Sequence, residues 1–121
     1  MLQNDFFYFT EPQLEDNIVK TSIELNAAHQ IFKGHFPQQP VLPGVCMMQI
    51  VKEVTEHYVG NKTRLAKADN LKFLSFIDPT QSKFIRMELK VNLAEGQIKV
   101  DAQLLDDTTT FFKFKGTFVQ K

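Results

Sequence analysis

A histidine and a glutamine, fourteen positions apart, are the residues of this sequence with the clearest capacity for chemistry. His35 opens the stretch HFPQQPVLPGVCMMQ, and Gln49 closes it. An imidazole titrates near neutral pH, so His35 could act as a general base. The glutamine cannot release a proton, although its amide can donate a hydrogen bond or hold a water molecule. Taken alone, a histidine is more often a packed or surface residue than a base, so the residue types make His35 and Gln49 candidates and no more.

The backbone between these two residues is heavily restricted. Pro37, Pro40 and Pro43 each fix φ, which reduces the freedom that the loop loses in holding His35 in place. Gly44 follows at once, and a glycine lets a ligand approach the backbone closely. We therefore expect a rigid loop that holds the histidine beside the start of a helix.

The other reactive side chains have no motif around them. His29 and His57 are interpreted as ordinary surface residues. Cys46 has no partner base in view, so a small core or tunnel-wall residue is a better interpretation than a reactive thiolate. Met47 and Met48 are expected in the core or in the lining of a pocket.

The composition is typical of a single globular domain covering residues 1–121. Hydrophobic residues make up 43% and charged residues 23%. The 14 basic and 14 acidic residues cancel, which gives no electrostatic argument for binding nucleic acid or an anionic membrane surface. Twelve phenylalanines and no tryptophan predict a phenylalanine-rich core or an apolar cavity.

Location and cofactors are predicted from features that the sequence lacks. It has one cysteine, no recognisable signal peptide and no apolar run long enough to span a membrane, so we expect a cytoplasmic protein. It shows no close cluster of metal-ligating residues and no glycine-rich phosphate loop. We expect neither a metal nor another cofactor.

Alternating apolar residues predict antiparallel strands over 17–25, 83–93, 97–104 and 112–118. The short turn Ala94-Glu95-Gly96 joins two of them as a hairpin. Asp106-Asp107-Thr108 forms a second turn before the last strand.

One segment has helical periodicity instead, over residues 44–58. Pro43 suits the first turn, and Gly60 is a stop signal. The positions that recur at helical spacing are Val45, Met48, Val51 or Lys52, Val54 or Thr55, and Tyr58. One helix with four or more strands, most of them after it, predicts an α+β domain in which a sheet packs around or against a single helix.

The stretch GHFPQQPVLPGV resembles the signature of the 3-hydroxyacyl-acyl carrier protein dehydratases, which have the hot-dog fold. The family pattern is close to His-Phe-Pro-x-x-Pro-x-x-Pro-Gly-Val. The matching positions are His35, Phe36, Pro37, Pro40, Pro43, Gly44 and Val45. The resemblance is specific over residues 34–49, and by order of elements it extends over roughly 18–118.

The resemblance implies a hot-dog fold in which an antiparallel sheet wraps a central helix. It implies dehydration of a 3-hydroxyacyl thioester on acyl carrier protein, with His35 as the base and the backbone amide of Gly44 donating to the thioester oxygen. Phe36, Pro43, Val45 and Met48 are then expected to contact the substrate in an apolar tunnel. It also implies a dimer, with the histidine of one subunit near the central helix of the other.

Gln49 departs from the family pattern, which has an acidic residue fourteen positions after the histidine. Three explanations remain open. A neighbouring acid could substitute, with Glu53 one helical turn further on, although Gln49, Lys52, Glu53 and Glu56 are more simply interpreted as a solvated stripe. The reaction could instead be thioester hydrolysis. Or the chain could be a non-catalytic acyl-binding or scaffold subunit of a heterodimeric dehydratase.

Overall fold

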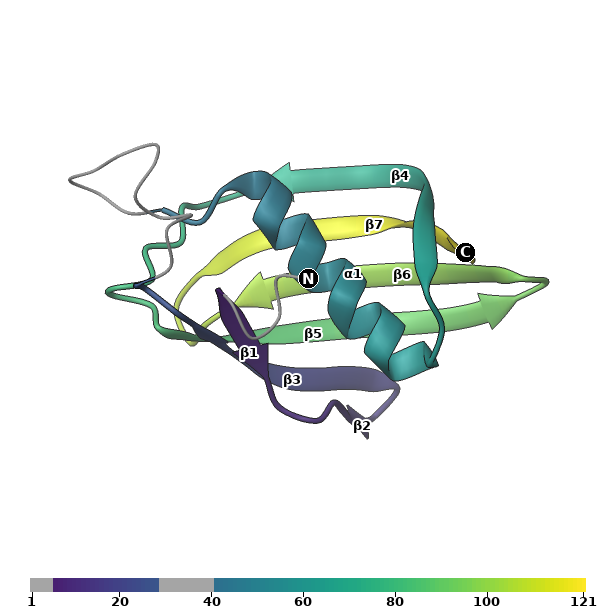
Figure 1. The fold of residues 1–121 in the computed structure, drawn as a ribbon, viewed down its shortest axis with the longest axis horizontal. Coiled ribbons are helices and arrows are strands. Elements are labelled where there is room, and N and C mark those ends of the chain that lie inside the picture. Colours follow the sequence, from purple (N-terminus) through teal and green to yellow (C-terminus); the bar gives the residue numbers. More distant parts are fainter. Residues whose placement is uncertain (1–5, 29–40) are drawn as a thin grey trace.

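The computed structural model describes residues 6–28 and 41–121, which form one helix and a seven-stranded antiparallel sheet. The sheet order is β1-β3-β5-β6-β7-β4, and β2 also pairs with β3. The helix α1 crosses one face of the sheet obliquely (Figure 1). The elements are β1 (Phe7–Phe9), β2 (Gln13–Glu15), β3 (Ile18–Leu25), α1 (Gly44–Val59), β4 (Thr63–Phe73), β5 (Phe84–Ala94), β6 (Gln97–Leu105) and β7 (Thr110–Gln120).

The four strands predicted from alternation are confirmed as β3, β5, β6 and β7, and the α+β prediction is confirmed with them. In β6 every second side chain is buried against the helix side, as a half-buried strand requires. The β5–β6 turn has positive φ at both Glu95 and Gly96, which suits the right-handed twist of a hairpin.

The core is rich in phenylalanine, as the composition predicts. The largest fully buried side chains include Phe6, Phe7, Phe112, Phe114 and Phe118. They belong to one cluster with the buried face of α1, whose members Ile50, Val51 and Val54 are fully withdrawn from solvent. Burial of this single apolar face therefore fixes both the position and the rotation of the helix.

The residues that recur at helical spacing in α1 do not all face the core. Val45 is 77% exposed and Tyr58 is also exposed, whereas Cys46, Met47 and Ile50 are buried. The first turn is apolar on nearly every side, so periodicity alone could not select which residues face the core. The helix bounds were close to the prediction: Pro43 is the N-cap rather than a first-turn residue, and Gly60 ends the helix in the left-handed conformation.

Strand β4 was not found from periodicity. Its pairing with β7 is irregular between Leu65 and Lys67 and again between Ala68 and Asn70, so the inward and outward positions do not alternate along its length. It also lies at the edge of the sheet, where only Thr63 is buried. An irregular edge strand does not show the alternation of buried and exposed side chains from which a strand is predicted.

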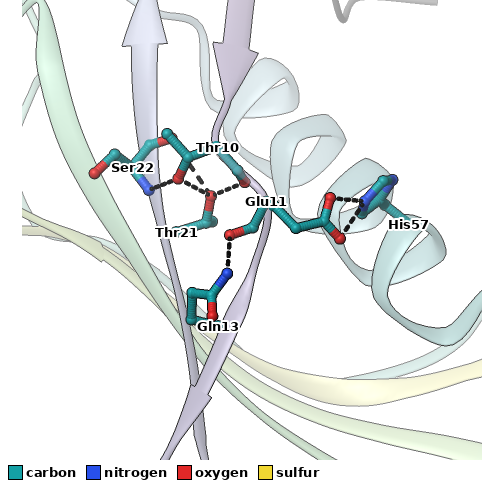
Figure 2. Close-up of polar contacts among 6 residues, drawn as sticks. All are labelled: Thr10, Glu11, Gln13, Thr21, Ser22 and His57. Atoms are coloured by element: carbon teal, nitrogen blue, oxygen red, sulfur yellow. Dashed lines mark hydrogen bonds and ion pairs between the residues drawn. The ribbon is translucent and has the colours of Figure 1, made fainter.

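A short strap, residues 10–12, joins β1 to β2 and ties the N-terminal region to both layers (Figure 2). The backbone carbonyl of Thr10 accepts a hydrogen bond of 2.6 Å from the hydroxyl of Thr21 in β3. The Glu11 carboxylate lies 3.0 Å from Nε2 of His57 in the last turn of α1. His57 is exposed, which agrees with its interpretation as a surface residue.

Gly116 provides a test of the β4–β7 junction. A Cβ built there would meet the backbone carbonyl of Lys67 and come within 2.5 Å of the Phe114 ring. Gly→Ala in an ordinary strand is expected to stabilise the fold. We expect Gly116→Ala to lower the free energy of unfolding by roughly 1–3 kcal/mol instead, measured by urea denaturation. Thr117→Ala is the control, and equal effects of the two changes would contradict a rigid close approach at Gly116.

Cys46 provides a second test, of the core beneath the helix start. Burial raises the pKa of the Cys46 thiol to about 11, so the thiol stays protonated near neutral pH. We expect native protein to react with a soluble disulfide reagent far more slowly than protein unfolded in urea. Equal rates for the two states would show that the thiol is accessible and would contradict its place in the core.

Candidate functional site

Two of the predicted site residues, His35 and Phe36, lie outside the described residues, as do Pro37 and Pro40. Their proposed roles stay predictions. The described chain resumes at Val41 and reaches the start of α1 three residues later. The signature therefore leads directly into the N-terminus of the helix, as the sequence predicts.

Gly44 is the first residue of α1, and the chain before it is held by backbone hydrogen bonds. Leu42 donates to the carbonyl of Ile77 at 2.9 Å, and the Pro43 carbonyl accepts from Cys46 at 3.0 Å. The Gly44 amide is one of the first four N–H groups of the helix, which have no partner within the helix itself. Such an amide, at the positive end of the helix dipole, suits a developing oxyanion.

The side chain that most closely approaches Gly44 is Phe73, a residue that sequence analysis did not single out as part of the site. A Cβ built on Gly44 would lie 2.7 Å from the Phe73 ring. Phe73 ends β4, and its ring stacks on that of Phe112 with a centroid separation of 5.0 Å. Glycine at position 44 thus makes room for this ring, and the signal in the sequence was that Phe73 stands where the resembled family has a phenylalanine-containing strand.

The other predicted substrate contacts have different environments. Pro43 is half-buried, Met48 packs partly against the core, and Val45 projects into solvent. Next along the chain from Phe73, Leu74 and Phe76 are also exposed. An exposed set of large apolar side chains near the helix start is typical of a contact surface.

Gln49 and Glu53 lie together on the next turns of α1. The Gln49 amide nitrogen donates a hydrogen bond of 2.9 Å to Oε2 of Glu53, which is only 4% exposed. The interpretation of this row as a solvated stripe was therefore wrong for Glu53. The helix face is not open to solvent along its whole length, since Thr63 at the start of β4 lines the same cavity as Glu53, and the Thr63 backbone N–H donates to Glu56 at 2.7 Å.

A cavity of about 500 Å³ opens beside this face of the helix. Its lining residues are Gln49, Lys52, Glu53, Glu56, Lys62, Thr63 and Lys121. These are polar side chains, so this cavity is not the apolar tunnel expected for a fatty chain. That tunnel stays a prediction. What the cavity offers instead is a buried carboxyl and an amide at one wall, with basic side chains around it.

A larger hollow of about 1,030 Å³ lies elsewhere, over strands β4 to β7. None of the predicted site residues in the described part of the chain lines it, and the side chains that do are mixed in charge, including Lys90, Asp101 and Lys115. We therefore place the candidate site beside α1 and not in the larger hollow. The cavity beside α1 brings together the Gln49 amide and the Glu53 carboxyl, which are hydrogen-bonded to each other.

Within residues 6–28 and 41–121, no three histidine, cysteine, aspartate or glutamate side chains are grouped so that they could hold a metal ion. In the same part of the chain, α1 is too short and too polar to cross a membrane.

Known proteins resemble this chain in sequence and in fold. The 3-hydroxyacyl-[acyl-carrier-protein] dehydratase FabZ of Syntrophomonas wolfei is 32% identical in an alignment that covers 67% of this chain and 65% of that protein. This chain thus spans slightly less than two thirds of that relative. The protein of the same description from Streptococcus sanguinis is 28% identical in an alignment that covers 81% of this chain and 78% of that protein.

Among solved structures, a chain of the dehydratase heterocomplex ApeI:P from Xenorhabdus doucetiae has a TM-score of 0.70 and 18% identity. The alignment covers 93% of this chain and 95% of that chain. At this level of identity the likeness concerns the fold, and it confirms the predicted hot-dog architecture. The sequence model of the ApeI-like family, described as ApeI dehydratase, matches residues 11–113. The chain therefore belongs to the ApeI-like dehydratase family.

Proposed function

We propose that this protein eliminates water from 3-hydroxyacyl thioesters of acyl carrier protein to give 2-enoyl thioesters. The observation that carries the proposal is that the family signature ends at the first turn of α1, with Gln49 and a buried carboxyl on the turns that follow. The chemistry needs a base, an oxyanion donor and a route for the leaving hydroxyl. This chain offers a candidate for each.

In this mechanism His35 takes the proton from C2 of the substrate. Negative charge then develops on the thioester oxygen, where the backbone amide of Gly44 donates a hydrogen bond at the positive end of α1. Pro43, Val45 and Met48 provide apolar contacts beside that amide, as does Phe36 if the family arrangement holds. The acyl carrier protein delivers the thioester, and the residues near the helix start receive it.

The protein is expected to work as a dimer, either with a second copy or with a related hot-dog subunit. Strand β4 is eleven residues long, and one of its edges has no strand partner among the described residues. It carries exposed Leu65, Leu71 and Phe73. A long apolar edge is a ready surface for pairing with another chain. The polar cavity beside α1 would then be closed by the partner's His35 loop, in the manner of the family.

A second function is favoured by one specific observation. The position that holds the family's acid is Gln49, and a fold relative of this chain occurs in a dehydratase heterocomplex. A non-catalytic subunit that holds an acyl chain or supports an active partner would tolerate this glutamine. Thioester hydrolysis is the third candidate, because a glutamine can hold water beside the same carbonyl.

The catalytic proposal is tested by dehydration of a 3-hydroxyacyl thioester on acyl carrier protein. The purified chain is assayed alone and with related hot-dog subunits, through the ultraviolet absorbance of the enoyl thioester. We expect His35→Ala to lower the rate by about 10²–10⁴-fold, because a positioned base is lost. His57→Gln is the matched control and should leave the rate unchanged. If wild type gives no product in any combination but binds the acyl carrier protein, the scaffold function is correct; release of free acid would indicate a thioesterase.

The assembly proposal is tested by sedimentation. We expect the wild type to be dimeric at micromolar concentration, or to become so with its partner subunit. Leu65→Lys with Leu71→Lys should weaken association roughly tenfold or more, because two apolar contacts at the edge are replaced by like charges. Leu93→Lys, at an exposed position near the end of β5, is the control. A wild type that stays monomeric with and without partners would contradict this proposal.

A further inference from the structure

The family's acid position is occupied by an amide, yet a buried carboxyl lies within one hydrogen bond of that amide. Four residues along a helix displace the backbone by about 6 Å along the axis. The two side chains together span this displacement, since Oε2 of Glu53 lies 2.9 Å from the Gln49 amide nitrogen. The two head groups thus occupy neighbouring places at one wall of the cavity beside α1.

The other acid on this helix face already has a structural role. One carboxylate oxygen of Glu56 accepts from both the backbone N–H and the hydroxyl of Thr63, at 2.7 and 3.2 Å. These bonds tie the end of α1 to the first residue of β4. Glu56 is therefore an anchor between two elements, whereas Glu53 is the acid paired with the residue at the family's catalytic position.

Burial and position support the case for Glu53. The residue is only 4% exposed, and it lines the cavity beside α1 together with Gln49. An acid in the wall of a cavity, next to the position where the family has its acid, is a candidate for a proton donor. The charged and titratable groups that share this cavity are Lys52 and Glu56 on α1, Lys62 before β4, and the C-terminal residue Lys121.

We infer that Glu53 is the proton donor to the leaving hydroxyl and that Gln49 positions it, so that the acid of this enzyme is displaced by one helical turn. The inference rests on the dehydratase function proposed above. It makes Glu53 a catalytic residue and Gln49 a positioning residue, and it explains how a member of this family could retain full chemistry without an acid at position 49.

The step balances as follows. The C2 proton passes to the imidazole of His35, and the electron pair of that C–H bond forms the C2–C3 double bond. The C3–O bond breaks and its electron pair stays with oxygen, which takes the carboxyl proton of Glu53 and leaves as water. The Gln49 N–H donates to the carboxylate that remains. Proton exchange with solvent then returns one proton to Glu53 and removes one from His35.

Glu53→Gln is the decisive change, because an amide is nearly isosteric and its oxygen still accepts from Gln49. We expect kcat to fall by about 10²–10⁴-fold and the limb of the pH–rate profile that belongs to the acid to disappear. A purely structural role would alter thermal stability without changing the shape of the pH profile. Glu88→Gln, which alters a carboxylate bonded to Gln103 between β5 and β6, is the matched control and should behave as wild type.

Exchanging the two side chains gives a rescue test. In the double variant Gln49→Glu/Glu53→Gln, the same pair is present with its acid at the family's position. We expect this variant to recover at least tenfold of the activity lost in Glu53→Gln, as a positioned acid is restored. Gln49→Glu alone should lower the rate, because it removes the amide N–H that positions Glu53 and places a second carboxyl group beside it.

The outcomes separate this inference from the proposed function. If the wild type is active and Glu53→Gln has the same rate and the same pH dependence, the inference is overturned and the dehydratase function remains intact. A loss seen only in Glu56→Gln would overturn it in favour of the other acid. A large gain from Gln49→Glu would overturn it by showing that wild type lacks a donor. Wild type inactive on every thioester, with every partner, would overturn the proposed function and this inference together.

Discussion

The packing of one apolar face of α1 against the sheet is the interaction on which the rest of this structure depends. Ile50, Val51 and Val54 are fully buried in a core that the phenylalanines of β7 complete. Because these side chains cannot turn away from the core, the helix has a single rotation. That rotation sends Val45 into solvent and carries Gln49 and Glu53 toward the polar cavity. The arrangement of the candidate site is therefore a consequence of hydrophobic burial.

The edge strand β4 gives this helix its second constraint. At its start, Thr63 is bonded to Glu56 near the end of α1. At its other end, the ring of Phe73 lies over Gly44 at the beginning of the helix. Both ends of the helix are thus held by one strand whose outer edge has no strand partner among the described residues. A subunit that pairs with this edge would therefore bind the strand that contacts both ends of α1.

The pair Gln49–Glu53 joins the fold to the functional proposals. A glutamine stands at the position where the family has an acid, and a buried glutamate accepts a hydrogen bond of 2.9 Å from it. This pair is the feature on which the catalytic proposal and the further inference both depend. Family membership establishes the type of protein, and the proposed experiments on these two side chains address the chemistry of this particular chain.

The sequence by itself determined the elements whose burial alternates regularly, and the family through the signature from His35 to Val45. Period-two alternation is set by the backbone, so β3, β5, β6 and β7 and their hairpin could be placed before any coordinates. The helix and its glycine stop could also be placed. The same local signals identified Gly44 and Gln49 as candidates and predicted a core rich in phenylalanine.

Only the tertiary structure decided the rotation of α1, the course of β4 and the environment of Glu53. The first helical turn is apolar on most sides, so the choice of buried face depends on the shape of the sheet beneath it. The irregular pairing of β4 with β7 removes the alternation that would reveal a strand. Glu53 looks solvated in a helical pattern, yet it is buried in the fold, where it shares a cavity with Thr63 of β4, ten residues later in the chain. Burial by a distant segment is a property of the whole fold, which local periodicity cannot record.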